Sequence, residues 1–383
     1  MLKGKLNIIH ICSWYPNKLK PMDGNFVHKH IASTIHDVNA IAIAVYETRS
    51  SLKKIYSVDE TEKDGVKSII IYHRMRSFMI LNILFRMYYY IKAFELARKK
   101  LGQVHLIHAH VTLFAGVFSY LQAFLTGIPY IISEHSTIYR QNNISSLKLW
   151  LARLAISKSR AFLPVSSDLN NTVRAFNIRS KHTVVPNVID GKFFYPQEHE
   201  KTEKIKILHV STLDDNTKNI SGMLRVIQTV THKRPNIQFQ IIGERNIAKT
   251  KRMIDQLRIK EANLELLGPM CQEDISAYFR AADCFLLFSN HETFSVVLAE
   301  AWSCGIPAIY SNCGGLTNLD DPRLGVQVGK KDETAMVKAI FKVVDQLETY
   351  DPMFMHQYIQ QQSGVETIRN KLLSLYRDCA LPS

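Results

Sequence analysis

Residues 284–301 read CFLLFSNHETFSVVLAEA, a stretch that contains a strand, a turn and the start of a helix. Cys284–Phe288 is a short, continuously apolar run, typical of a buried strand, and Ser295–Cys304 has helical periodicity. Glu292 falls in the turn and Glu300 on the helix. Free N–H groups at a helix start attract phosphate, and a nearby carboxylate accepts hydrogen bonds from a sugar or ribose diol. The alternative is a capping acid and a surface glutamate.

The same alternation of apolar runs and amphipathic segments extends along the chain. The predicted strands are Leu6–Ile11, Ala40–Val45, Val104–Ile107, Tyr130–Ile132, Phe162–Val165, Thr183–Val185, Ile205–Val210, Ile237–Ile242, Leu264–Leu267, Cys284–Leu287 and Ala308–Tyr310. Between most of them lie segments with helical periodicity. This pattern indicates parallel sheets covered on both faces. We expect an α/β protein of two doubly wound domains facing each other across a cleft, with functional residues beyond the C-terminal ends of the strands.

A polar stretch divides the two series of strands. Pro196–Lys204 is rich in charge and poor in apolar residues, which is typical of a linker. Residues 1–195 are therefore predicted to form the first domain and residues 205–360 the second. Residues 361–383 are expected to form a C-terminal helix that packs back toward the first domain.

Composition and charge narrow the class of protein. The 383 residues are 46% hydrophobic and 21% charged, which excludes a disordered or collagen-like chain. The formal net charge is +14, and residues 1–200 carry almost all of it, with 26 Lys and Arg against 13 Asp and Glu. Such charge suggests an anionic partner: phosphate groups, nucleic acid or an acidic membrane surface. Six cysteines without a Cys-x-x-Cys pair favour reduced thiols and a cytoplasmic location.

Motifs on both sides of Glu300 resemble the donor site of a known enzyme family. They are Glu292-x7-Glu300-Ala301, Cys304-Gly305-x-Pro307, Ser311 and Gly314-Gly315. Together they resemble the signature of family 4 retaining glycosyltransferases. Val185–Asp190 is similar to that family's Pro-Asn-x-x-Asp element, and Ser13–Pro16 with Asp23-Gly24 is similar to its first glycine loop. The resemblance implies the GT-B fold, with two Rossmann-like domains: an acceptor domain first and a nucleotide-sugar domain second.

The resemblance also implies roles for residues of the second domain. Glu300 would hold the ribose of the donor nucleotide, and Glu292 would contact the transferred sugar. The backbone N–H groups of Phe294 and Ser295 would lie near the diphosphate or the sugar. Lys218 occupies the position of the family's diphosphate-binding lysine. The expected catalytic residues are Glu292 and Lys218 of the second domain and His135 of the first domain.

Two residues of the first domain and one departure complete the comparison with the family. Gly24 would let a loop amide approach the diphosphate. His135, in Ser133–Ser136, matches the family histidine that lines the sugar and acceptor side. Where the family has an arginine before Lys218, this chain has Thr212, and a hydroxyl does not replace a bidentate guanidinium. We expect Arg245 to compensate; otherwise donor handling is weakened.

The expected reaction breaks a sugar–diphosphate bond and needs no metal. Negative charge develops on the leaving oxygen, where Lys218 and the helix start near Phe294 can stabilise it. No Asp-x-Asp occurs in the chain, so we expect no metal-bridged diphosphate and no cofactor. A retaining glycosidase needs two carboxylates about 5–5.5 Å apart, an arrangement that Glu292 and Glu300 do not suit. The resemblance implies front-face displacement instead.

His108-Ala109-His110 has three interpretations. Residues i and i+2 of a strand share a face, so a His-x-His pair can bind zinc. No third ligand is identifiable in the sequence. His110, at the expected end of the strand, is alternatively an acceptor-side residue together with His135, or it has a structural hydrogen-bonding role.

The basic segment Lys63–Lys100 contains nine Lys and Arg with interleaved aromatic residues. A helix of this kind can lie on an anionic membrane surface, and the alternative is a core helix with a solvated basic face. No nucleic-acid motif accompanies the charge, so no nucleic-acid partner is expected. Val111–Ile132 is broken by Gly116, Gln122, Gly127 and Pro129, which favours a buried helix and strand over a membrane span.

The leading hypothesis is a cytoplasmic, membrane-peripheral glycosyltransferase. It would move a sugar from a nucleotide-diphosphate donor to a glycan or lipid-linked acceptor in cell-surface polysaccharide synthesis. The alternative is a non-catalytic nucleotide-sugar-binding or scaffold protein on the same fold, because Thr212 replaces the family arginine.

Overall fold

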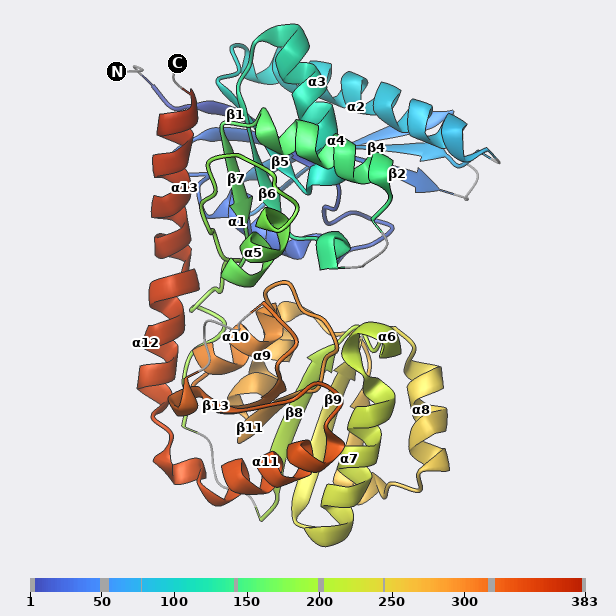
Figure 1. The fold of residues 1–383 in the computed structure, drawn as a ribbon, viewed down its shortest axis with the longest axis vertical. Helices are drawn as coiled ribbons and strands as arrows, with labels where there is room; N and C mark the ends of the chain where they lie inside the picture. The colour runs from blue at the N-terminus through green and yellow to red at the C-terminus, as the bar shows by residue number, and fades with distance from the viewer. Residues whose placement is uncertain are drawn as a thin grey trace. The chain divides into compact units, whose positions relative to one another are not determined.

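The structure is a computed structural model that describes residues 4–48, 55–76, 78–140, 144–198, 203–243, 245–315 and 321–380. The chain divides into two compact units. Unit 1 comprises residues 1–188 and 366–383, and unit 2 comprises residues 189–365. In Figure 1 each unit is a sheet flanked by helices.

Unit 1 is built on a seven-stranded sheet of order β3-β4-β2-β1-β5-β6-β7. Its strands are β1 (Asn7–Cys12), β2 (Asn39–Thr48), β3 (Tyr56–Lys63), β4 (Val66–Arg74), β5 (Leu106–His110), β6 (Tyr130–Glu134) and β7 (Ala161–Pro164). Neighbouring strands pair in parallel, except for the antiparallel β3–β4 hairpin at one edge. The central strands are buried on both faces, as the apolar runs predict.

The helices of unit 1 are α1 (Asn25–Ala32), α2 (Met79–Leu101), α3 (Val117–Thr126), α4 (Ser146–Ser157), α5 (Ser167–Arg174) and α13 (Val365–Ala380). Ser166 caps α5 by accepting a hydrogen bond from the Leu169 amide at 3.1 Å. α13, which begins at the last residue of unit 2, is held in unit 1 by two contacts. Arg369 pairs with Asp37 at 2.7 Å, and the Tyr376 hydroxyl lies 2.9 Å from Nδ1 of His108.

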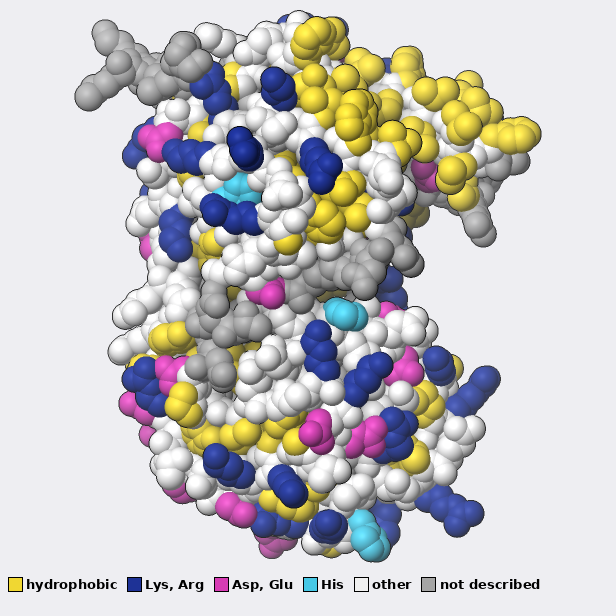
Figure 2. Space-filling view, viewed as in Figure 1, with side chains coloured by type: hydrophobic (Ala, Val, Ile, Leu, Met, Phe, Trp, Pro, Cys, Tyr) yellow, Lys and Arg dark blue, Asp and Glu magenta, His cyan; other side chains and the backbone are white. Residues whose placement is uncertain are grey.

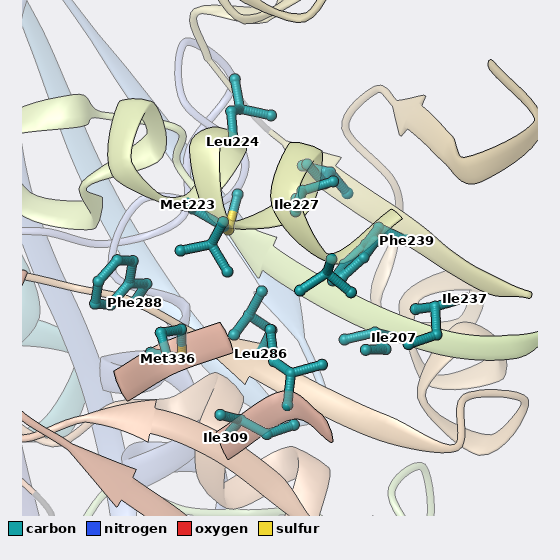
Figure 3. Packing of buried hydrophobic residues seen from close by; sticks show 14 of the residues in the cluster. Ile207, Met223, Leu224, Ile227, Ile237, Phe239, Leu286, Phe288, Ile309 and Met336 are labelled. Carbon is teal, nitrogen blue, oxygen red and sulfur yellow. The ribbon is translucent and has the colours of Figure 1, made fainter. Parts of the chain in front are cut away.

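Unit 2 is built on a six-stranded parallel sheet of order β10-β9-β8-β11-β12-β13. Its strands are β8 (Ile205–Ser211), β9 (Ile237–Gly243), β10 (Leu264–Leu267), β11 (Cys284–Leu287), β12 (Ala308–Ser311) and β13 (Gly325–Val328). Its helices are α6 (Asp215–Lys218), α7 (Ile220–Lys233), α8 (Ile247–Gln256), α9 (Gln272–Arg280), α10 (Val296–Ser303), α11 (Glu333–Asp345) and α12 (Pro352–Ser363). Met223 and Ile227 of α7 pack with Phe239 and Leu286 of the sheet and Met336 of α11 in one buried cluster (Figure 3).

The predicted α/β fold of two doubly wound domains is confirmed at the level of each unit, with corrections at the sheet edges. β3, β4 and β13 were not predicted. β3 exposes most of its side chains and carries acidic and basic residues, so it lacks the apolar run that marks a central strand. Thr183–Val185 is not a strand: its amides bond to Phe162 and Pro164 without forming a ladder.

The apolar region Val111–Ile132 forms a helix and a strand, as predicted. A kinked turn at Thr112–Gly116, with non-helical backbone at Leu113 and Phe114, leads into α3, and β6 follows. Among the described residues, no helix combines the length and apolar character needed to cross a bilayer.

Candidate active site

An ion pair joins the loops that follow two neighbouring strands of unit 2. Lys218 ends α6, the short helix after β8, and Glu292 lies in the loop after β11. Lys218 Nζ and Glu292 Oε1 are 2.6 Å apart, and the two side chains are only 16% and 10% exposed. Ser289 Oγ also donates to Glu292 Oε1 at 2.9 Å. The predicted pair of catalytic residues is therefore in contact at the C-terminal edge of the sheet, where ligands of doubly wound domains bind.

A glycine and a left-handed serine shape the loop between Glu292 and α10. Ser295 precedes α10 with φ 69°, and its buried hydroxyl bonds to no described residue. Gly315 has φ 77°, and a Cβ there would lie 2.9 Å from the Phe294 backbone nitrogen. Only glycine permits this approach of the two loops. The first amides of α10 have no intrahelical partner, so Phe294 and Ser295 stand beside N–H groups that can bind an anion.

A hydrogen-bond chain positions Thr212, which directly follows β8. His209 Nδ1 donates to the Leu286 carbonyl at 2.9 Å, so Nε2 is the acceptor for Ser211 Oγ at 2.8 Å. Ser211 Oγ in turn accepts from the Leu213 amide at 3.1 Å. Burial lowers the pKa of His209 to about 4, so the ring is neutral near pH 7 and can hold this chain. Sequence reasoning missed His209, because a histidine inside an apolar strand gives no signal of its own.

Arg245 and Thr212 lie at the same edge of the sheet of unit 2. The register pairs Ser211 of β8 with Gly243 of β9, so Thr212 and Arg245 follow adjacent parallel strands at the same edge of the sheet. Arg245 is exposed. Glu300 is buried on α10, in its second turn. The predicted donor-site residues of unit 2 thus gather beyond or near the ends of β8, β9 and β11.

The predicted residues of unit 1 also lie at the C-terminal ends of strands. Gly24 precedes α1 with φ 67°, and a Cβ there would lie 2.5 Å from the Trp14 carbonyl. His110 ends β5 and His135 follows β6. Glu134, the last residue of β6, accepts backbone N–H bonds from Thr112, His135 and Ser136 at 2.7–2.9 Å. Burial raises the pKa of Glu134, and these bonds oppose that shift.

His110 and His135 belong to a cluster of five buried histidines that the sequence did not reveal. The others are His10 on β1, His30 on α1 and His108 on β5. Burial lowers the pKa of His10 to about 3 and that of His30 to about 4, and it holds the pKa of the remaining three well below the usual range. The pairing of β1 with β5, which places His10 opposite His108, is the signal that could have shown part of the cluster.

Two doubly wound α/β units with these loops define the class of GT-B glycosyltransferase folds. The chain resembles sucrose-phosphate synthase from Thermosynechococcus elongatus with a TM-score of 0.78 and 16% identity, over 97% of this chain and 98% of that one. It resembles Anabaena HepE in complex with UDP and glucose with a TM-score of 0.74 and 14% identity, over 97% of this chain and all of that one (100%).

Two family models match consecutive parts of the chain. Residues 36–193 match Glycosyltransferase Family 4, and residues 204–346 match Glycosyl transferases group 1. The chain belongs to this family of glycosyltransferases. It is 25% identical over 290 residues to a phosphatidylinositol N-acetylglucosaminyltransferase subunit from Arabidopsis thaliana, covering 73% of this chain and 63% of the relative. The chain therefore spans less than two thirds of that relative's length.

The close contact at Gly315 leads to a first prediction. Gly315→Ala places a methyl group against the Phe294 backbone in a left-handed conformation, so the loop before α10 must shift. We expect nucleotide affinity, measured by calorimetry with whichever of UDP, GDP or ADP the wild type binds, to fall at least tenfold. Gly329→Ala is the matched control, because its Cβ meets only Asp332 Cβ at 3.8 Å. Equal affinity in both variants would contradict this role for Gly315.

The neutral ring of His209 leads to a second prediction. Its pKa of about 4 lies below the unfolded value of 6.5, so the unfolded chain binds the extra proton first and His209 weakens folding as the pH falls from 6.5 toward 4. In this range His209 lowers the free energy of unfolding by about 1.4 kcal/mol per pH unit, and His209→Asn should remove this decrease.

The measurement is urea unfolding at pH 7 and pH 5, followed by fluorescence. Trp302 is buried in unit 2, and replacing Trp14 and Trp150 by Phe leaves it as the only tryptophan. The His209→Asn variant should lose less stability between the two pH values than the chain that retains His209. Parallel pH dependences would contradict a buried neutral His209.

Proposed function

We propose that the protein is a retaining, metal-independent glycosyltransferase that uses a nucleotide-diphosphate sugar. The observation that carries the proposal is the Lys218–Glu292 ion pair beside the start of α10. A diphosphate brings more negative charge than one carboxylate, so it can compete with Glu292 for Lys218. The family membership and the resemblance to HepE in complex with UDP support a nucleotide-sugar donor.

The site residues have separate tasks in the proposed reaction. As the bond between the sugar and the diphosphate breaks, Lys218 and the first amides of α10 stabilise the charge on the leaving oxygen. Glu292, released from Lys218, contacts the transferred sugar, and Glu300 holds the ribose. Arg245 contributes the cationic charge that Thr212 lacks. The leaving phosphate takes the proton of the acceptor hydroxyl. The oxygen of that hydroxyl bonds to the sugar on the same face from which the diphosphate departs.

The acceptor is proposed to be a glycan or lipid-linked molecule used in cell-surface polysaccharide synthesis, reached at the cytoplasmic face of a membrane. His110 and His135 are the proposed acceptor-side residues. Support comes from the excess positive charge of residues 1–200 and from the Arabidopsis relative, whose name describes transfer to phosphatidylinositol.

The surface of unit 1 supports the membrane part of the proposal, with a change in the residues involved. The basic segment Lys63–Lys100 is not one helix. Its residues up to Arg74 belong to β3 and β4, and its helical part is α2, Met79–Leu101. Hydrophobic side chains gather over α2, α3 and α4 (Figure 2). The exposed large ones are Phe78, Met79, Ile80, Leu81, Ile83, Leu84, Tyr88, Ile91, Leu121, Phe124, Leu125, Leu147 and Trp150. A patch of this extent marks an interaction site, and Arg74 and Lys148 are exposed on the same unit.

A non-catalytic nucleotide-sugar-binding protein is the second candidate, because Thr212 stands where the family has an arginine. It predicts nucleotide binding without sugar transfer or donor hydrolysis. Product analysis with radiolabelled donors separates the two candidates.

The third prediction concerns donor binding. One of UDP, GDP or ADP should bind in the presence of EDTA, and Lys218→Met should weaken its binding about 100-fold, because the main cation for the diphosphate is lost. Lys260→Met, an exposed lysine of the same unit, is the control and should bind normally. Binding of none of the nucleotides, or strict dependence on Mg²⁺, would overturn the proposal.

The fourth prediction concerns membrane binding, tested by liposome flotation. The protein should float with anionic vesicles and not with neutral ones. Replacing Phe78, Met79 and Leu84 by Ser should abolish flotation, whereas Met353→Ser, an exposed methionine of unit 2, should not change it.

A charge variant completes this test. Arg76 and Arg86 are poor choices, because they stack on Phe85 and Phe114, at 5.1 and 4.1 Å from the ring centroids. Reversal of the exposed Arg74 and Lys148 to Glu should instead reduce binding to anionic vesicles. Flotation that survives both sets of substitutions would exclude this surface as the membrane contact.

A further inference from the structure

Three rings of the histidine cluster of unit 1, His30, His110 and His135, share a pattern of contacts that His10 also shows. In His30, Nε2 lies 2.9 Å from the Pro186 carbonyl; in His135, Nδ1 lies 3.1 Å from Asn187 Oδ1. In His110, Nε2 lies 3.1 Å from Nδ1 of His10. Each of these three rings therefore has one nitrogen in contact with a hydrogen-bonding group of a neighbouring residue.

The other nitrogen of each ring is buried and has no hydrogen-bond partner among the described residues. These atoms are Nδ1 of His30, Nδ1 of His110 and Nε2 of His135. The three side chains are at most 6% exposed. A buried polar atom without a partner costs about 1–3 kcal/mol, and among the described residues the cluster contains four such nitrogens, these three and Nε2 of His10. This concentration indicates that a ligand normally satisfies these atoms.

These contacts determine which of the remaining ring nitrogens carry lone pairs. A carbonyl and a side-chain amide oxygen can only accept, so His30 is protonated at Nε2 and His135 at Nδ1. The unpartnered nitrogens of these two rings are thus lone-pair donors. His110 has the same arrangement when its Nε2–H donates to His10. Metal-bound histidines in proteins show this pattern, in which the second N–H is held by an oxygen acceptor that orients the ring.

The three rings are also close enough to share one ion. One ring nitrogen from each of His30, His110 and His135 lies within 4.8 Å of the others. Zn–N bonds of about 2.0–2.1 Å place tetrahedral ligand nitrogens about 3.4 Å apart, so binding needs the rings to move by on the order of an ångström. His108 fits less well, because both of its nitrogens are engaged, by the Tyr376 and Ser133 hydroxyls.

We propose that His30, His110 and His135 form a three-histidine binding site for a divalent transition-metal ion, with Zn²⁺ as the best match to three neutral imidazoles. Asn187 and the Pro186 carbonyl are the groups that orient two of the ligands. The fourth position of the ion is open to water or to an oxygen of a ligand. All three ligands belong to unit 1, and two of them, His110 and His135, are also the proposed acceptor-side residues.

The test uses the full chain, stripped with EDTA and then titrated with Zn²⁺ by calorimetry and elemental analysis. We expect one ion per chain in the wild type. His30→Gln and His135→Gln should each weaken binding at least 100-fold. Asn187→Ala, which removes only an orienting contact, should weaken it about 10–100-fold. His36→Ala, at an exposed histidine outside the cluster, should bind like the wild type.

Two controls keep the proposal falsifiable. Circular dichroism of the metal-free variants shows whether each one folds. If the histidine variants do not fold, Co²⁺ in the wild-type chain gives the answer, because a tetrahedral nitrogen site has a distinctive visible absorption. Wild-type chain that retains no Zn²⁺ and shows no such Co²⁺ spectrum, or folded variants that bind as tightly as the wild type, would overturn the proposal. UDP binding in EDTA tests the donor site independently.

Discussion

The ion pair between Lys218 and Glu292 ties together the two loops on which the proposed donor site of unit 2 depends. Both side chains are largely withdrawn from water, so each charge needs the other. Ser289 binds the same carboxylate oxygen, and the Glu292 amide donates to the Cys313 carbonyl at 3.0 Å. The pair therefore fixes the loop before α10 against the loop that carries Gly315. A ligand that takes over Lys218 also alters the contacts of Glu292, so in the proposed reaction donor binding is linked to the position of Glu292.

Unit 1 buries a group of neutral histidines where unit 2 has an ion pair. Five imidazoles share one buried region, and burial keeps them neutral. Neutral rings cost less to bury than charged ones, but each still has two nitrogens to satisfy. Glu134 beside them is held by three backbone amides rather than by a cation.

The sequence predicted those features that depend on local pattern. Apolar runs located the central strands of both sheets, and the turn at Glu292 with Gly314-Gly315 pointed to two loops that lie in contact at Phe294 and Gly315. It missed β3, whose polar side chains suit an exposed edge. It also missed contacts between distant elements: His209 with Leu286 of the neighbouring strand, and His10 of β1 and His30 of α1 with the His-x-His pair. Such contacts join residues far apart in the chain, and no spacing rule reveals them.

The central claim is that the diphosphate replaces Glu292 as the partner of Lys218, and a double-mutant cycle on UDP affinity tests it most directly. Glu292→Gln should leave UDP binding as tight or make it tighter, since Lys218 is then unpaired. Lys218→Met should weaken binding strongly, and the double variant should bind like Lys218→Met alone. If Glu292→Gln weakens UDP binding as much as Lys218→Met does, and the two effects add, the account is wrong.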